Sequence, residues 1–240
     1  MNDNKEILSQ LNSLLQSGNS SYDIFNDFID LILFALQGDD ESYLKIVHKY
    51  PNTKPIGHRE IDFFHTAFQL LQYEMRETNS DVLGELYMQW NMSNKYKGQF
   101  FTPKNVASMM AQITNPTGGR ILDPSCGSGV MLVEAIKTMK HEDLDKAAFY
   151  GQDIDLTCVK MTALNLCFFN VNGYVIQGNT LTMECNKVYQ TGRSIYGGSI
   201  KELCSEQLEE FKASYIPSIE KMVSENPIVI KQDLEQLTLF

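Results

Sequence analysis

Hydrophobic residues recur at helical spacing through the first 90 residues of the chain. Ile7 and Leu11 lie four positions apart, and spacings of three or four positions continue through residues 24–33 and 61–75. The aromatic residues in these stretches are explained by the apolar face of a helix that packs on a core. The pattern therefore predicts a helical N-terminal region over residues 1–90.

From residue 98 the pattern changes to short β-like runs that end in turns and lead into helices. These runs lie at residues 121–122, 147–151 and 174–176, and helices are predicted near residues 129–140 and 156–169. Strands that alternate with helices at this interval predict right-handed βαβ crossovers and a parallel sheet, with a ligand site at the carboxyl ends of the strands. The expected fold class is α/β, with a partial Rossmann-like sheet after the helical region.

After Leu181 this alternation is not expected to continue. Residues 200–225 predict one or two polar helices, and only residues 227–230 have the character of a further strand. We therefore divide the chain into a helical region, residues 1–90, and a ligand-binding domain, residues 91–240, which ends in a helical tail and a terminal peptide.

The composition is that of an ordinary globular protein, with 43% hydrophobic and 21% charged residues. The longest apolar stretch, Leu31 to Leu36, is far shorter than the roughly 18 residues that cross a bilayer. The N-terminus lacks the basic and apolar segments of a secretory signal, so a cytoplasmic location without a membrane partner is expected. The five cysteines show neither C-x-x-C spacing nor a histidine cluster, so no disulfide framework and no metal site is expected.

The net charge of −10 is unusual for a protein that binds DNA unaided, because Lys and Arg neutralise the phosphates. Residues 1–90 carry 6 basic against 14 acidic side chains, whereas residues 91–180 carry 8 against 7. Only this middle segment, which contains the motifs below, is not acidic.

The run from Asp123 to Gly129, DPSCGSG, is the strongest chemical motif in the chain. A strand ends at an acid, small residues let the backbone approach a ligand, and a helix begins. The free N–H groups at the start of that helix favour an anionic group such as a carboxylate. A tight strand-to-helix turn without a ligand is the alternative, but an Asp, a Pro and two glycines in this order favour the binding interpretation.

This heptapeptide is similar to the S-adenosylmethionine loop of N6-adenine-specific DNA methyltransferases, particularly the M subunits of type I restriction-modification systems. Upstream, GQFFTP at residues 98–103 resembles the preceding cofactor element of that family. Downstream, GQDID at residues 151–155 resembles the second-strand acid that accepts hydrogen bonds from the ribose hydroxyls. The resemblance covers about residues 80–182, and it implies S-adenosylmethionine as cofactor and modification of DNA adenine at N6.

The resemblance also implies a role for single residues. Asp153 is expected to contact the ribose, while Asp155 is the second choice or the cap of the next helix. Asn179 stands where the family usually has an Asp that contacts the adenine amino group, and its carbonyl oxygen can still accept a hydrogen bond. The implied cofactor-binding residues are Gln99, Phe101, Thr102, Asp123, Pro124, Cys126, Gly127, Gly129, Asp153 and Asn179.

One element of the family is missing. Adenine methyltransferases place an Asn-Pro-Pro-Tyr motif at the end of the fourth strand, where it holds a flipped-out adenine, and no such motif follows Leu181. The stretch at Asn115 is interpreted as the linker into the first strand. Asn226 is the one candidate for a degenerate catalytic residue, and a helix stop is its alternative. A complete sheet of this methyltransferase class has seven strands, and at about 5–6 residues per strand with crossovers of about a dozen, the roughly 60 residues after Leu181 are too few for the other four, so the sheet is expected to be truncated.

Two hypotheses about function follow. In the first, the chain is an adenine methyltransferase or its cofactor-binding part, and a partner such as a specificity subunit or a second methyltransferase subunit supplies the base-holding residues and helps it bind DNA. In the second, it is a catalytically inactive relative that acts as a cofactor sensor or as an adaptor associated with DNA or with the sliding clamp. The sequence leaves open whether methyl transfer occurs.

The last five residues, QLTLF, form a second motif. They resemble the peptide by which bacterial polymerases and repair proteins dock on the DNA sliding clamp, and a chance apolar tail is the alternative. The expected partner-binding residues are Gln236, Leu237, Leu239 and Phe240.

Overall fold

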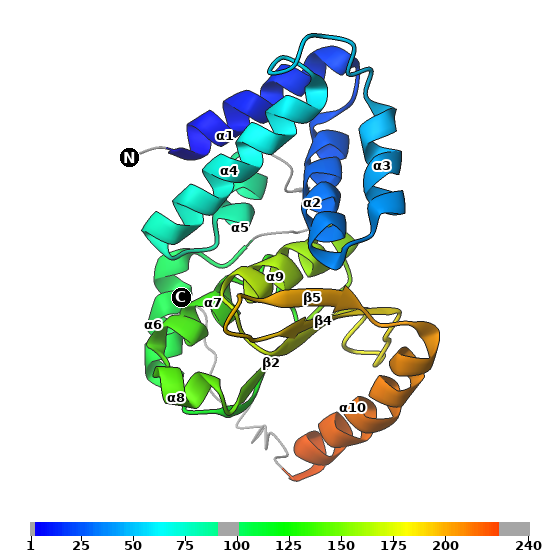
Figure 1. The fold of residues 1–240 in the computed structure, drawn as a ribbon. Helices are drawn as coiled ribbons and strands as arrows, with labels where there is room; N and C mark the ends of the chain where they lie inside the picture. Colours follow the sequence, from blue (N-terminus) through cyan, green and yellow to red (C-terminus); the bar gives the residue numbers. More distant parts are fainter. Residues whose placement is uncertain (1–2, 91–100, 226–240) are drawn as a thin grey trace, which may run out of the picture. The chain divides into compact units, whose positions relative to one another are not determined.

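The computed structural model describes residues 3–90 and 101–225. Residues 1–203 form one compact unit, and residues 204–240 form a second. The first unit contains a group of N-terminal helices followed by a five-stranded sheet with its own helices (Figure 1). The second contains helix α10 (Ser205–Glu225), which confirms the polar helix predicted for this part of the chain.

The helical character predicted for the first 90 residues is confirmed. Ser20 caps α2 by accepting a hydrogen bond from the Asp23 N–H, and Gly38 ends the same helix in the left-handed region at φ 70°. Asp39 then caps α3, which was not predicted separately because it contains no fully buried residue. The elements of this region are α1 (Asp3–Asn12), the 3-10 turn η1 (Ser13–Ser17), α2 (Ser21–Gln37), α3 (Asp40–Lys49), α4 (Glu60–Thr78) and α5 (Val82–Gln89).

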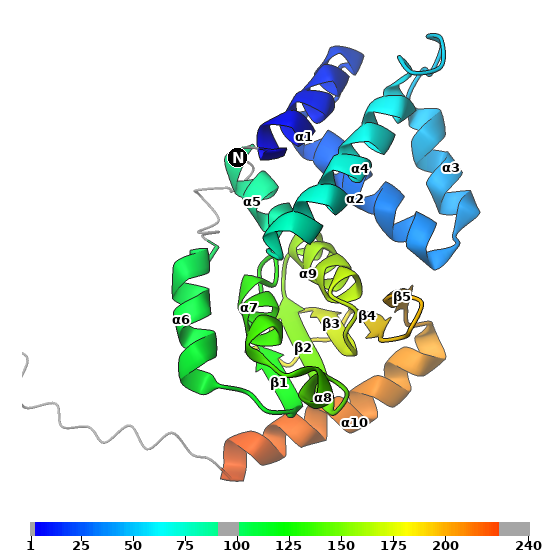
Figure 2. The ribbon, with the colours of Figure 1, turned by 60° about the vertical axis from the view of Figure 1, so that its left-hand side comes forward.

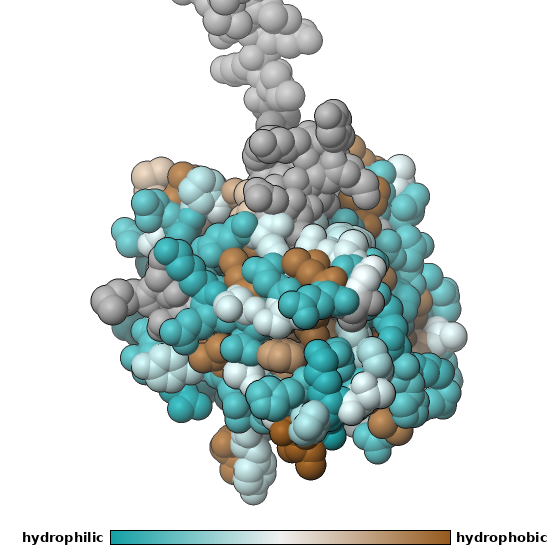
Figure 3. Space-filling view, turned by 90° about the horizontal axis from the view of Figure 1, so that it is seen from above, coloured by the Kyte–Doolittle hydropathy of each residue, from teal (hydrophilic) through white to brown (hydrophobic). Residues whose placement is uncertain are grey.

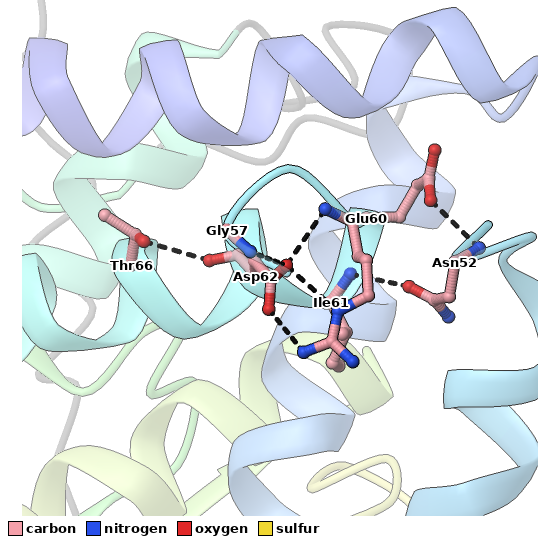
Figure 4. Close-up of polar contacts among 7 residues, drawn as sticks. Asn52, Gly57, Glu60, Ile61, Asp62 and Thr66 are labelled. Atoms are coloured by element: carbon pink, nitrogen blue, oxygen red, sulfur yellow. Dashed lines mark hydrogen bonds and ion pairs between the residues drawn. The ribbon is translucent and has the colours of Figure 1, made fainter. Parts of the chain in front are cut away.

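Side-chain hydrogen bonds fix the loop that leads into α4 (Figure 4). The Asp62 carboxylate accepts from the backbone N–H of Gly57 at 2.7 Å and of Arg59 at 2.9 Å. The Arg59 guanidinium also donates to it, and this bond holds the pKa of Asp62 well below its usual range. On the other side of the loop, the Asn52 carbonyl oxygen accepts from the Ile61 N–H at 2.9 Å. The start of α4 is therefore defined by its own polar residues.

The sheet confirms the three strands predicted from the middle of the sequence. Its order is β1-β2-β3-β4-β5, in which β1, β2 and β3 are parallel. The chain moves from β1 to β2 to β3 in one direction across the sheet. Because such crossovers are right-handed, both connecting helices, α7 (Val130–Thr138) and α9 (Leu156–Phe168), lie on the same face. The short helix α8 (His141–Leu144) precedes the second strand. The strands are β1 (Gly119–Asp123), β2 (Ala147–Asp153), β3 (Gly173–Gln177), β4 (Lys187–Gly192) and β5 (Ser199–Glu202).

The expectation that no strand lies between Leu181 and residue 226 was wrong. β4 pairs antiparallel with β3, and β5 pairs antiparallel with β4, so a hairpin extends the sheet beyond β3 without a further crossover. Val188 and Tyr189 of β4 are buried in the core. The apolar run in β4 is short, and polar residues rather than a helix follow it, so the alternating strand–helix pattern did not predict a strand here. The α/β class with a partial parallel sheet is confirmed.

A continuous hydrophobic core joins the N-terminal helices to the sheet. Helix α9 is buried almost all round, because it lies between the strands and α2. Lys160 of α9 pairs with Asp30 of α2 at 2.5 Å, and burial raises the pKa of this carboxyl group. The division of the chain at residue 90 stays a prediction. Core residues from successive elements include Ile7, Leu11, Phe25, Phe28, Leu83, Leu86, Val159, Leu164, Phe149 and Val175.

Figure 3 shows one face of the molecule, on which apolar side chains are scattered among mostly hydrophilic ones. One exception is α6 (Lys104–Thr114), which stands beside α7 at the β1 end of the sheet (Figure 2). Its small residues Ala107 and Ala111 are buried, whereas Met109 and Ile113 are exposed. Within residues 3–90 and 101–225, no helix combines the length and the apolar character needed to cross a membrane.

Candidate functional site

The segment that runs from the last residue of β1 to the start of α7, residues 123–129, lies at the carboxyl edge of the parallel strands. Its backbone is tied to the second strand, because the Cys126 N–H donates to the Gln152 carbonyl and the Gly127 N–H donates to the Asp153 carboxylate, both at 2.9 Å. From α9, the Thr162 hydroxyl donates to the Gly127 carbonyl at 2.8 Å. The loop is therefore held from two neighbouring elements, and we call it the glycine loop.

Two glycines of this loop adopt conformations that other residues rarely adopt. Gly127 has φ 54°, and a Cβ there would lie 3.1 Å from the Phe101 ring. Gly129 has φ 91°, and a Cβ there would lie 3.0 Å from Thr162. Helix α7 then begins at Val130 without a side-chain cap, so its first N–H groups can serve an anionic ligand. The residue types of the motif are thus required by the shape of the loop.

Two acids stand at the ends of neighbouring strands. Asp123 ends β1, and Asp153 ends the neighbouring strand β2, two residues beyond Gly151, the register partner of Asp123. Burial raises the pKa of Asp123, an effect that the N–H of Ser125 opposes and the charge of Asp153 adds to. Two partly buried carboxylates favour a ligand that is cationic or that donates hydrogen bonds.

The structure distinguishes the two acids of the GQDID segment. Asp155 is the N-cap of α9, and its carboxylate accepts from the N–H groups of Thr157 at 2.8 Å and Cys158 at 3.2 Å. Asp153 instead accepts from Gly127 in the glycine loop and from the Asp155 N–H at 2.9 Å. Of the two, Asp153 is the acid in contact with the glycine loop.

The loop after β3 adds a third side to the site. The side-chain carbonyl oxygen of Asn179 accepts from the Leu181 N–H at 2.9 Å and so shapes the turn. The Thr180 hydroxyl donates to the Pro124 carbonyl at 2.6 Å, which joins this turn to the glycine loop. Thr180 was not singled out from the sequence, although its place directly after the third strand was a signal. Ile154 and Leu181, which are 67% and 94% exposed, are the apolar side chains beside these polar groups.

The segment Phe101 to Pro103 also contacts the glycine loop. Phe101 stacks on Tyr87 of α5, with ring centroids 5.4 Å apart, and lies beside Gly127. Thr102 lines a pocket of about 320 Å³ together with Ser128 and Val130. This volume is at the lower end of small-molecule pockets.

Cys126 differs from the other motif residues because its side chain points into the core. It is 4% exposed, and its Sγ lies 3.4 Å from the Thr162 hydroxyl oxygen. Burial raises the pKa of this thiol well above its ordinary value. A ligand above the loop would therefore meet Cys126 through its backbone.

The sequence analysis missed a buried acid below the loop. Asp81 caps α5 and contacts Ser128 and Asn165. The sequence did contain a signal for this contact. Gly84 lies three residues after Asp81, and a glycine inside a helix often marks a close approach of another part of the chain.

Several predicted residues lie outside the described part of the chain. They are the cofactor candidate Gln99, the catalytic candidate Asn226, and the terminal residues Gln236, Leu237, Leu239 and Phe240.

Comparison with known proteins places this geometry in context. A family model described as N-6 DNA Methylase matches residues 78–195. The MjaIX methylase subunit, a type I restriction enzyme protein of Methanocaldococcus jannaschii, is 25% identical over 155 residues, which are 61% of this chain and 28% of that protein. The MpnII methylase subunit of Mycoplasma pneumoniae, of the same enzyme type, is 29% identical over 131 residues, 50% of this chain and 24% of that protein.

The chain thus spans about a quarter of the length of these curated relatives. Among solved structures, a modification subunit assigned to a type I restriction enzyme of Vibrio vulnificus is 24% identical. The alignment covers 52% of this chain and 25% of that one, with a TM-score of 0.30.

Proposed function

This chain belongs to the N-6 DNA methylase family through residues 78–195, and on that premise we propose that it binds S-adenosylmethionine in the service of adenine N6 methylation in DNA. The observation that carries the proposal is the hydrogen bond from the Gly127 N–H to the Asp153 carboxylate. It unites the glycine loop and the second-strand acid in one site at the carboxyl edge of the sheet, where ligands of parallel sheets bind.

The residues of the site fit the groups of S-adenosylmethionine. Asp123, which is partly buried, suits the cationic amino and sulfonium groups, and Asp153 suits the ribose hydroxyls. The uncapped start of α7 suits the carboxylate. Ile154 and Leu181 offer exposed apolar surface to the flat adenine ring. When bound, the cofactor supplies an electrophilic methyl group.

The task of this chain is then to hold the cofactor and to orient it. The left-handed conformations of Gly127 and Gly129 let the backbone approach the ligand closely. Thr180 closes the third side by its bond to the Pro124 carbonyl. Correct orientation of the reacting groups accounts for much of the rate enhancement in a transfer of this kind.

For the partners, we propose DNA together with a second polypeptide, such as a specificity subunit or another methyltransferase subunit. The proposal is supported by the net charge of −10 and by the missing Asn-Pro-Pro-Tyr element in the sequence. The proposed location is the cytoplasm. An adaptor or cofactor sensor without catalytic activity is the second candidate, which the same missing element favours.

The terminal QLTLF peptide supports one more proposed partner, the bacterial sliding clamp. A ring already threaded on DNA would hold an acidic protein close to its substrate by effective concentration. The test is a titration of clamp with a peptide of residues 231–240 and with a chain that lacks Gln236 to Phe240. A peptide that does not bind, or a truncation that leaves the affinity unchanged, would exclude this partner.

The experiment that tests the cofactor proposal is thermal unfolding with increasing S-adenosylmethionine. A ligand that binds only the folded state stabilises it by about 2.7 kcal/mol at a hundredfold excess over Kd, so the Tm should rise with concentration. Labelled methyl transfer to DNA, measured on the same sample, separates the two candidates. A Tm that does not change at any concentration would refute cofactor binding.

A further inference from the structure

A buried carboxylate lies directly beneath the glycine loop. Asp81 is 5% exposed, and it accepts hydrogen bonds from the Gly84 N–H at 2.8 Å and the Asn165 amide at 2.7 Å. The Ser128 hydroxyl donates to the same carboxylate. These three donors come from α5, α9 and the glycine loop, so a single side chain joins three elements.

Ser128 is held on both sides. Its hydroxyl is bound by Asp81, and its carbonyl accepts from the Asn165 amide at 2.8 Å. The approach of α5 is so close that a Cβ at Gly84 would overlap the Ser128 hydroxyl and the Asp81 carboxylate. Figure 2 shows α5 above α7 and α9.

The contacts cross a long stretch of sequence. Asp81 and Ser128 are separated by 47 residues, and Asp81 and Asn165 by 84. Ser128 lies between the two glycines whose left-handed backbone shapes the glycine loop. A displacement of Ser128 would therefore change the backbone that faces a ligand.

We infer that Asp81 is a positioning residue, whose carboxylate holds Ser128 and thereby sets the glycine loop in its ligand-binding conformation. The N-terminal helices are then part of the support of the site. The inference rests on the proposed function where it concerns S-adenosylmethionine, but the conformation of the loop can be measured without a ligand.

The chemistry of Asp81 distinguishes this role from that of an ordinary helix cap. Asn caps helices as well as Asp does, so Asp81→Asn preserves the cap on α5. A carboxylate can accept from all three donors, whereas an amide has one acceptor oxygen, which can stay with Gly84 and Asn165, and its NH2 group then faces the Ser128 hydroxyl, which must accept instead of donate. Asp81→Asn should therefore keep the cap on α5 but replace the charge-assisted bond to Ser128 with a weaker neutral one.

The test measures amide hydrogen exchange of residues 127–130 in the free protein and the affinity for S-adenosylmethionine by calorimetry. In Asp81→Asn and in Ser128→Ala, exchange of these amides should accelerate at least tenfold and Kd should rise at least tenfold. Because both changes act on the same contact, the double variant should be no worse than the more affected single variant. Asp39→Asn is the matched control, since Asp39 caps α3 by accepting from the Ser42 N–H at 3.0 Å.

Each outcome decides the inference. If Ser128→Ala leaves loop exchange and Kd within twofold of the unchanged protein, Asp81 is only a helix cap, whether or not Asp81→Asn folds. If the unchanged protein binds no S-adenosylmethionine, the proposed function is lost, and loop exchange alone decides whether Asp81 positions the loop. Acceleration in Asp39→Asn as well would also overturn the assignment.

Discussion

At the scale of the residue, the partly buried carboxylate of Asp123 has no cationic partner among the contacts that the structure describes, and burial raises its pKa. We expect Asp123→Asn to weaken S-adenosylmethionine binding about 10- to 100-fold, because a hydrogen bond to a charged group contributes about 1.5–3 kcal/mol. Calorimetry should show this loss, while Glu142→Gln, an exposed acid of α8, should leave the affinity unchanged. Equal effects of the two changes would contradict the role of Asp123.

The pKa of Asp81 predicts how stability depends on pH. Burial raises this pKa to about 6, above the value of the unfolded chain, so the contribution of Asp81 to stability is greatest below about pH 4 and is lost as the pH rises through 6. A shift of this size corresponds to about 3 kcal/mol. In urea unfolding, the free energy of unfolding of the unchanged protein should fall between pH 4 and pH 7 by about this much more than that of Asp81→Asn. Parallel pH profiles of the two proteins would show that Asp81 is not perturbed.

Sequence reasoning identified the acids of the site better than it identified their supports. The order of Asp123 and Asp153 along the chain followed from the strand ends, and for Asp155 the sequence left two interpretations open, a helix cap or a second ribose contact. Thr180 and Asp81 were not foreseen, because their roles depend on contacts with residues 56 and 47 positions away. No local pattern encodes such contacts, although Gly84 within α5 hinted at one of them.

At the scale of the element, α9 is central because it contacts strands on one side and N-terminal helices on the other. Leu164→Ala should destabilise the protein by about 2–5 kcal/mol, since Leu164 is fully buried and the change leaves a cavity. Leu181→Ala, at a side chain that is 94% exposed, should change stability by less than about 0.5 kcal/mol. Urea unfolding compares the two, and a small loss for Leu164→Ala would mean that this part of the core is loosely packed.

The elements that the sequence predicted are those with a long, regular apolar pattern. Helices α2, α4, α7 and α9 were predicted on this basis, and strands β1 to β3 were predicted because each short apolar run leads through a turn into the next element of the alternating pattern. The hairpin of β4 and β5 was missed, because its apolar residues are few and its strands gain their stability by pairing with β3. Tertiary pairing of this kind overrides the local preference of a polar segment.

At the scale of the whole molecule, the charge of −10 and the missing base-holding motif lead to the same expectation. The purified chain should bind DNA weakly and transfer little or no labelled methyl to it, because few cations are available to neutralise phosphates. Filter binding and a methyl-transfer assay on unmethylated DNA measure the two quantities. Strong transfer that is lost on Asn226→Ala would contradict this expectation and would assign a catalytic role to Asn226.

The central claim is that the glycine loop binds S-adenosylmethionine, and calorimetric titration of three proteins tests it most directly. The unchanged protein should bind with micromolar or tighter affinity, which corresponds to about −8 kcal/mol. Gly127→Val should abolish binding, since φ is 54° and the Phe101 ring stands 3.1 Å from a Cβ at that position. Gly197→Val also has a positive φ, 111°, but no atom within 4 Å, so it should bind normally. The absence of binding by the unchanged protein, or unaltered binding by Gly127→Val, would contradict the claim.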